Sequence, residues 1–170
     1  VLFVMGSLGS ASINALMGSV LALLDEHQLQ CIYVTGKQHY DAFIEEHDET
    51  TFIKIVPYID QVQAMHEVSL MVTRGGATTA AEIMVSGCPS IIIPSPFVPN
   101  NHQYHNAKVL YDAGASILME EKDCDAQQLS MMILDLAEDT ERLNAMREKA
   151  MVLGRINAAE DFISWIDEVM

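Results

Sequence analysis

The chain has 170 residues, of which 50% are hydrophobic and 19% are charged, enough for one domain with a substantial buried core. Nine lysines and arginines against 24 aspartates and glutamates give a formal net charge of −15 at pH 7. This balance argues against a nucleic-acid binder and against docking to an anionic lipid surface, because both need basic patches. The three cysteines lie far apart in the sequence, which argues against a disulfide scaffold and favours a reducing compartment.

The start of the chain is apolar, but it fits neither a signal peptide nor a membrane span. The first cation is Lys37, so the basic segment of a signal peptide is missing. Gly6, Ser7 and Gly9 interrupt the apolar stretch before it reaches the roughly 18 residues that a spanning helix needs. We therefore expect no transmembrane segment. Because the chain starts inside an apparent buried strand and without Met, we also expect a fragment whose upstream part is missing.

Short apolar runs alternate with helical patterns along the whole chain. Six runs predict strands, at Val1–Met5, Cys31–Thr35, Phe52–Val56, Val68–Thr73, Ser90–Ile93 and Ala115–Met119. Helical spacing predicts helices at about 12–27, 39–46, 77–86 and 102–113, and three more between about 125 and 169. Gly87 is expected to end the helix at 77–86, and Gly154 to separate the last two helices. Strands that are apolar on both faces need helices on both sides, so the expected fold class is α/β, a Rossmann-like doubly wound parallel six-stranded sheet.

Ligands of such sheets bind beyond the carboxyl ends of the strands, where four loops are chemically unusual. The first loop, Gly6 to Ser10, has glycines that let backbone N–H groups approach an anion in front of a helix N-terminus. An ordinary strand-to-helix turn with a serine N-cap fits these residues equally well. The pattern is neither a dinucleotide fingerprint nor a Walker A loop. It is not a nucleophile elbow either, because Met5 stands where that motif needs glycine.

The second loop, Arg74 to Glu82, opens a predicted helix with two glycines and small residues. This leaves room for a phosphate over bare N–H groups, and Thr78 and Thr79 could bind that ligand or cap the helix. Glu82 lies one turn further along an apolar stretch, where an unpaired carboxylate is costly. A carboxylate that faces a cleft suits a vicinal diol such as that of ribose. The alternative is a solvated glutamate on the outer face of the helix.

The third loop, Pro57 to Asp60, offers a flat aromatic ring and free backbone groups to a planar base. Taken alone, this pattern is more typical of a turn with a core aromatic residue.

The fourth loop, Asn100 to Asn106, enters a predicted helix on which Gln103 and Asn106 share a face. Their amides can both donate to and accept from sugar hydroxyls. His102 and His105 have a similar spacing, but no nearby Cys, Asp or Glu completes a ligand set, so we expect no metal. A polar helix start is the alternative interpretation.

The four loops hold a single lysine or arginine, so backbone N–H groups are the expected phosphate ligands. Together these segments resemble four ordered motifs of one family of GT-B glycosyltransferases, the MurG family, which adds N-acetylglucosamine to the lipid-linked precursor of peptidoglycan. The similar segments are Ser7 and Gly9 in Gly-Ser-Leu-Gly-Ser, Tyr58-Ile59, Arg74 to Glu82, and Asn101-His102-Gln103 with Asn106-Ala107. The resemblance covers nearly the whole chain.

The resemblance implies that residues 1–170 form the C-terminal domain, which binds the nucleotide-sugar donor, as one half of a GT-B fold. The N-terminal acceptor domain, which holds the catalytic base, would be absent. Main-chain groups of Ile59, with Tyr58 alongside, would recognise uracil, and Glu82 would take the ribose hydroxyls.

Ser7 and the N–H groups of residues 77–79 would then hold the diphosphate. Gln103 and Asn106 would hold the sugar. The full set of expected substrate-binding residues is Ser7, Gly9, Tyr58, Ile59, Arg74, Gly76, Ala77, Thr78, Thr79, Glu82, His102, Gln103 and Asn106.

The resemblance further implies an inverting transfer from UDP-N-acetylglucosamine by direct displacement, without a cofactor or an essential metal. Helix N-termini would stabilise the departing diphosphate. The complete protein would lie on the cytoplasmic face of the membrane and take its lipid-linked acceptor through the missing domain. Met5 and Leu8 depart from the family pattern. They leave open another GT-B transferase with a different UDP-sugar, or a non-catalytic nucleotide-binding domain.

Overall fold

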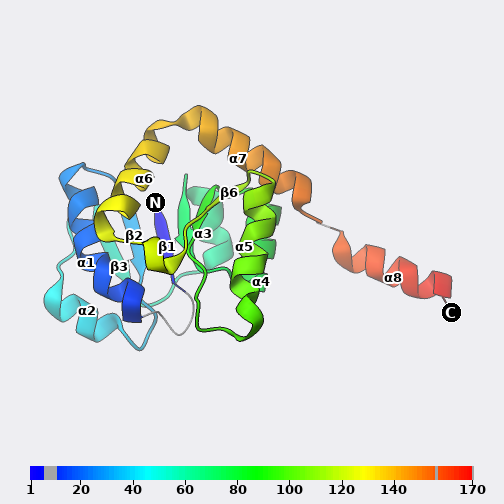
Figure 1. Ribbon diagram of the computed structural model, residues 1–170, viewed down its shortest axis with the longest axis horizontal. Helices are drawn as coiled ribbons and strands as arrows, with labels where there is room; N and C mark the ends of the chain where they lie inside the picture. The colour runs from blue at the N-terminus through cyan, green and yellow to red at the C-terminus, as the bar shows by residue number, and fades with distance from the viewer. Residues whose placement is uncertain (6–10, 156, 170) are drawn as a thin grey trace.

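A computed structural model describes residues 1–5, 11–155 and 157–169, and shows one six-stranded parallel sheet (Figure 1). The strands are β1 (Leu2–Val4), β2 (Cys31–Val34), β3 (Ile53–Val56), β4 (Met71–Thr73), β5 (Ser90–Ile92) and β6 (Ser116–Leu118). Their order is β3-β2-β1-β4-β5-β6, and every neighbouring pair is parallel. All six predicted strands and the predicted fold class are therefore confirmed. The strand order reverses direction between β1 and β4, which is where such folds bind ligands.

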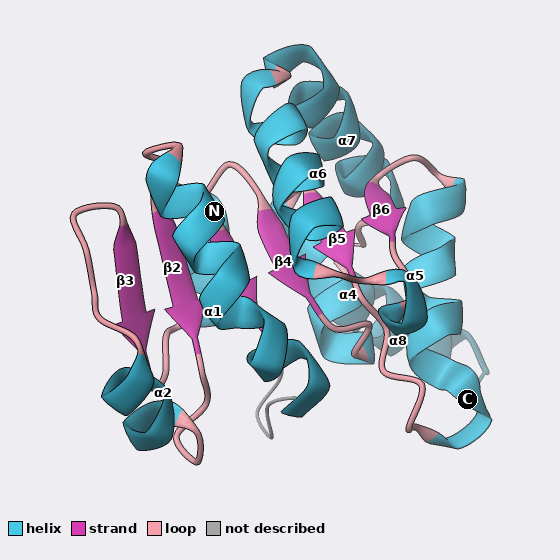
Figure 2. Cartoon of the chain, turned by 60° about the vertical axis from the view of Figure 1, so that its left-hand side comes forward, coloured by secondary structure: helices cyan, strands magenta, loops and turns pink. Residues whose placement is uncertain are grey.

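Helices cover both faces of the sheet (Figure 2). They are α1 (Ala11–Glu26), α2 (Tyr40–Glu46), α3 (Gln61–Glu67), α4 (Ala77–Ser86), α5 (His102–Asp112), α6 (Ala126–Glu138), α7 (Thr140–Leu153) and α8 (Ala158–Val169). Side chains of α1, α2 and α6 pack with Phe3 and Val72 in one apolar cluster, while those of α3, α4 and α5 pack with Leu2 and Met71 in another. Consecutive strand residues thus face opposite helical layers, as the period of two in a strand requires. α7 joins the layers, because Met146 belongs to the first cluster and Ala150 to the second.

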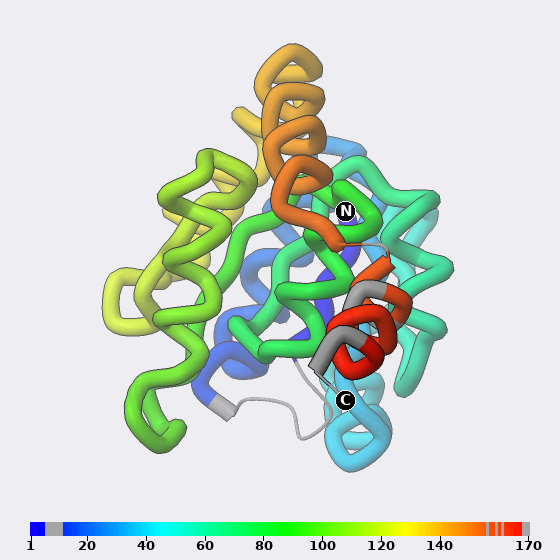
Figure 3. The backbone as a smooth tube through the Cα atoms, turned by 90° about the vertical axis from the view of Figure 1, so that its right-hand side faces the viewer, coloured from blue at the N-terminus to red at the C-terminus, as the bar shows by residue number. Residues whose placement is uncertain are grey.

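The last helix, α8, extends away from the sheet in Figure 1 and lies in front of the rest of the chain in Figure 3. Among the described residues, neither apolar cluster includes a side chain of α8, and Phe162, Ile163 and Trp165 are exposed. Gly154 ends α7, so the predicted break between the last two helices is confirmed. Within the described part of the chain, every helix is too short or too polar to cross a membrane.

The main element that the sequence did not predict is α3, a helix of seven residues. Asp60 caps it, because the carboxylate accepts a 3.1 Å hydrogen bond from Gln63 N. Two short 3-10 helices, η1 (Pro99–Asn101) and η2 (Glu121–Asp123), were also not predicted. Gly87 ends α4 at φ +67°, a left-handed conformation that favours glycine, as the sequence predicted.

Candidate functional site

A cleft of about 650 Å³ lies at the carboxyl ends of the strands on the β3 side of the strand-order reversal. Its wall is formed by the ends of β1 and β2, the loops after β2 and β3, the first turn of α3 and the first two turns of α4. The lining residues are Val4, Val34, Gly36, Lys37, Gln38, Pro57, Tyr58, Ile59, Asp60, Gln61, Val62, Thr78, Thr79 and Glu82. Five predicted site residues, from the second and third loops, therefore meet in one place.

The N-terminus of α4 forms one wall of this cleft. Its N-cap is Gly76, in extended conformation, and no side chain of the described residues caps it. Thr78 is exposed and Thr79 is half-buried, so the first turn is accessible. The N–H groups of this turn and the helix dipole favour an anion here. A Cβ atom on Gly76 would meet only Thr79 Oγ1, at 3.7 Å, so the space over the turn is open.

Glu82 lies on the cleft side of α4 and is half-buried. Its Oε2 accepts a 2.6 Å hydrogen bond from Nε2 of Gln61, the first residue of α3. The same Nε2 lies 3.4 Å from Thr79 Oγ1. The structure therefore does not support the alternative of a solvated glutamate on the outer face of the helix.

Tyr58 and Ile59 form a less polar part of the lining. Tyr58 is 70% exposed, so its ring presents a free flat surface. Lys37 Nζ lies 5.8 Å from the centre of this ring, within range of a cation–π interaction. Analysis of the sequence did not select Lys37, Gln38 or Gln61, although a cation directly after the second predicted strand is a usable signal.

The described residues that line the cleft do not include Arg74. Its guanidinium is buried, with Nη1 donating to Ile93 O at 2.9 Å and lying 2.6 Å from Glu121 Oε2. Glu121 Oε1 in turn accepts a 2.5 Å hydrogen bond from Ser12 Oγ. Arg74 thus connects the end of β4 to η2 and α1, and its predicted contact with substrate stays a prediction.

The fourth loop lies beside the α4 turn and outside the lining of the cleft. Gln103 Oε1 accepts from Ser95 N at 2.9 Å, and Asn106 Nδ2 donates to Gly75 O at 3.0 Å. His102 Nδ1 lies 3.0 Å from Pro99 O. The Asn106 bond joins the first turns of α5 directly to the turn that precedes α4. A ligand would have to extend from the cleft across that turn to reach these amides.

Two predicted residues, Ser7 and Gly9, lie outside the described residues. Among the described residues, no group of three or more His, Cys, Asp or Glu side chains is placed to hold a metal ion.

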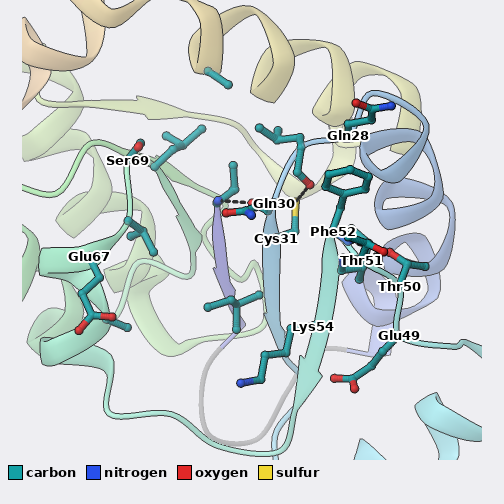
Figure 4. Close-up of a pocket in the computed structure, with 18 of the residues that line it drawn as sticks. Gln28, Gln30, Cys31, Glu49, Thr50, Thr51, Phe52, Lys54, Glu67 and Ser69 are labelled. Carbon is teal, nitrogen blue, oxygen red and sulfur yellow. Dashed lines mark hydrogen bonds between the residues drawn. The ribbon is translucent and has the colours of Figure 1, made fainter.

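A larger cavity of about 830 Å³ lies at the other end of the sheet, by the amino ends of the strands (Figure 4). Cys31, Lys54 and Glu67 lie around it. Burial raises the pKa of the Cys31 thiol to about 11, so this sulfur is protonated and a poor nucleophile at neutral pH. Parallel sheets bind ligands at their carboxyl ends, so the 650 Å³ cleft is the better candidate.

Comparison with known proteins shows the family of the chain. The profile of the glycosyltransferase family 28 C-terminal domain matches residues 1–164. The UDP-N-acetylglucosamine–N-acetylmuramyl-(pentapeptide) pyrophosphoryl-undecaprenol N-acetylglucosamine transferase of Salinibacter ruber is 41% identical over 163 residues, which cover 94% of this chain and 44% of that protein. The protein of the same name from a Thermoanaerobacter species is 38% identical over 172 residues, covering 96% and 46%. The chain therefore spans about half the length of the curated relatives it matches.

Solved structures of glycosyltransferases also match this chain. The crystal structure of Acinetobacter baumannii MurG matches with a TM-score of 0.83 and 26% identity, covering 98% of this chain and 49% of that one. The glycosyltransferase VinC matches with a TM-score of 0.72 and 12% identity, covering 99% and 41%, and so shares the fold alone.

Proposed function

The chain belongs to the glycosyltransferase family 28 C-terminal domain family, and from that premise we propose that it is the UDP-N-acetylglucosamine-binding half of an inverting glycosyltransferase. The observation that carries the proposal is the cleft, because its lining brings Glu82 and the first turn of α4 together with Tyr58 and Ile59. The relatives named above are N-acetylglucosamine transferases by name, and the cleft offers a base, a ribose and a diphosphate one partner each.

The groups have complementary tasks. Uracil lies against Tyr58 and bonds to main-chain groups of Ile59, while the Glu82 carboxylate accepts from the ribose hydroxyls. The diphosphate lies over the N–H groups of residues 77–79, where the dipole of α4 stabilises the negative charge that grows as the nucleotide leaves. The N-acetylglucosamine unit points toward Gln103 and Asn106, beyond the α4 turn.

The remaining chemistry belongs to the rest of the protein. Curated relatives are about twice as long as this chain and are named for an undecaprenol-linked acceptor. We assign the acceptor site and the catalytic base to that other half. The complete reaction is then the conversion of lipid I to lipid II at the cytoplasmic face of the membrane.

Calorimetric titration of the 170-residue chain with UDP-N-acetylglucosamine tests the proposal. We expect weak but measurable binding and no sugar transfer by this chain alone. Parallel titrations with UDP-glucose and UDP-galactose identify the preferred sugar. Stronger binding of either one would reassign the protein to a different UDP-sugar transferase. A folded protein that gives no heat at millimolar ligand would refute nucleotide-sugar binding and favour a domain that only contacts other proteins.

Replacing Glu82 by alanine tests the site itself. We expect UDP affinity to fall about 10- to 100-fold, because a hydrogen bond to a charged group contributes roughly 1.5–3 kcal/mol. Glu67→Ala on α3 removes an exposed carboxylate outside the cleft and is the matched control. Equal losses in the two variants would show that charge, and not the ribose contact, controls binding.

A further inference from the structure

The hydrogen bond between Gln61 and Glu82 joins α3 to α4 in the lining of the cleft. From it we infer that Gln61 is a positioning residue, which orients the Glu82 carboxylate and thereby sets the preference for ribose over 2′-deoxyribose. This inference rests on the proposed function, because it assumes that Glu82 receives the sugar hydroxyls of a uridine nucleotide.

The hydrogen-bonding chemistry of Gln61 and Glu82 determines which of their atoms are in contact. An ionised carboxylate only accepts hydrogen bonds, so Gln61 must present its amide nitrogen to Glu82. The same nitrogen lies 3.4 Å from Thr79 Oγ1, whose hydroxyl oxygen can accept its second hydrogen. Gln61 occupies one acceptor position on Glu82 Oε2. One position on Oε2 and two on Oε1 remain, so each carboxylate oxygen can still accept one sugar hydroxyl.

The backbone that carries Gln61 is held in place. Asp60 caps α3 at Gln63 N, and Ala64 and Met65 of α3 are buried in the same apolar cluster as Ile83 of α4. The separation of the two helices is therefore set by the core. The Gln61 side chain is long enough to bridge this separation with a 2.6 Å hydrogen bond. The Glu82 carboxylate is therefore oriented before any ligand binds.

A carboxylate that is oriented in advance distinguishes ribose from 2′-deoxyribose, because the deoxy sugar lacks one of the hydroxyls that it binds. Ribose places one hydroxyl on each carboxylate oxygen, whereas 2′-deoxyribose lacks one of these two hydrogen bonds in a half-buried cleft. A glutamate without Gln61 samples several rotamers and turns toward water when a hydroxyl is missing. The penalty for the deoxy sugar then falls, and so does the affinity for ribose.

The test measures the affinities of UDP and 2′-deoxy-UDP by calorimetry for the wild-type chain and for Gln61→Ala. We expect the wild-type chain to prefer UDP by about 10-fold or more, in line with one hydrogen bond to a charged group. In Gln61→Ala the preference should fall to about 2- to 3-fold, mainly through weaker UDP binding. A residue that only supports the fold would weaken both nucleotides equally and leave their ratio unchanged.

A second variant, Gln61→Glu, adds a pH readout. At pH 8 two facing carboxylates repel, so the preference for ribose should be lost. Near pH 5 the pair shares one proton and regains a hydrogen bond, so the preference should recover. The charged side chains among the described lining residues are Lys37, Asp60 and Glu82. All three remain in Gln61→Ala. This variant therefore measures how much these three groups by themselves change the ribose preference with pH.

Gln63 supplies the matched control, because it lies on the same helix but is exposed and bonds Glu67 at 3.3 Å. Gln63→Ala and Gln63→Glu should keep the wild-type ratio at both pH values. If the wild-type chain does not bind UDP, the proposed function itself fails. If it binds UDP and either shows no preference for ribose or keeps its preference in folded Gln61→Ala, the role of Gln61 is overturned while the proposed function stands.

Discussion

The side chain of Arg74 points into the protein, and this direction gives the residue a structural role. The residue follows β4 at the ligand-binding edge of the sheet, yet its guanidinium turns into the protein and meets Ile93 O and Glu121 Oε2. Both charged side chains are about nine-tenths buried, with 8% and 11% of their surfaces exposed. Ser12 Oγ bonds the other carboxylate oxygen, so the pair connects three elements around the edge of the sheet.

Replacing Arg74 by methionine should destabilise the fold by about 3–5 kcal/mol, because the Glu121 carboxylate is left buried without its partner. Urea unfolding followed by circular dichroism measures the change. The double variant Arg74→Met/Glu121→Leu should recover most of the loss, since no charge is then left unpaired. Lys108→Met is the control: its 2.7 Å pair with Asp112 is exposed and should contribute no more than about 1 kcal/mol. An Arg74 variant as stable as the Lys108 variant would contradict the structural role.

At the scale of elements, the turn before α4 is built around the close approach of α5. A Cβ atom on Gly75 would lie 2.2 Å from the main-chain oxygen of Gln103, a contact that only a hydrogen atom permits. Asn106 bonds the carbonyl of the same glycine. The two contacts hold the start of α5 against the N-terminus of α4, where the diphosphate is proposed to lie.

Gly75→Ala should therefore destabilise the protein by about 1–3 kcal/mol, the usual cost of overpacking, and should weaken UDP binding by displacing α5. The adjacent Gly76→Ala is the matched control, since its new Cβ has open space and its φ of −63° suits alanine. The control should lose only about 0.5–1 kcal/mol, because alanine is a poorer N-cap than glycine. Thermal and urea unfolding compare the two, and equal midpoints would show that α5 can shift without cost.

The sequence predicts elements better than it predicts their contacts. The six apolar runs are visible because each strand is covered on both faces, and periodicity reports burial directly. The seven-residue α3 was missed, because it places only Ala64 and Met65 in the core and Asp60 is a weak isolated signal. The close approach at Gly75 and the turn of Arg74 toward Glu121 depend on segments distant in sequence. No local pattern carries that information.

At the scale of the whole molecule, the three cysteines are buried in the apolar clusters on both sides of the sheet. Cys31 and Cys124 belong to the cluster with α1 and α6, and Cys88 to the cluster with α4 and α5. All three are free and buried, and burial raises the pKa of each thiol from 9.0 to about 11. The thiols are therefore protonated in the folded protein well above the pH at which they ionise in the unfolded chain.

This difference makes the whole fold sensitive to alkali. The stabilisation from the protonated thiols is fully present below about pH 9 and is lost as the pH rises toward 11, because the unfolded chain releases these protons first. We expect the free energy of unfolding in urea to fall between pH 8 and pH 10.5. The fall should be smaller in a variant with alanine at all three cysteines, whatever its stability at pH 8. In the folded wild-type protein at pH 8, a thiol reagent should react slowly at all three sites and rapidly once urea unfolds the chain. An identical alkaline loss in the cysteine-free variant would show that the thiols do not cause it.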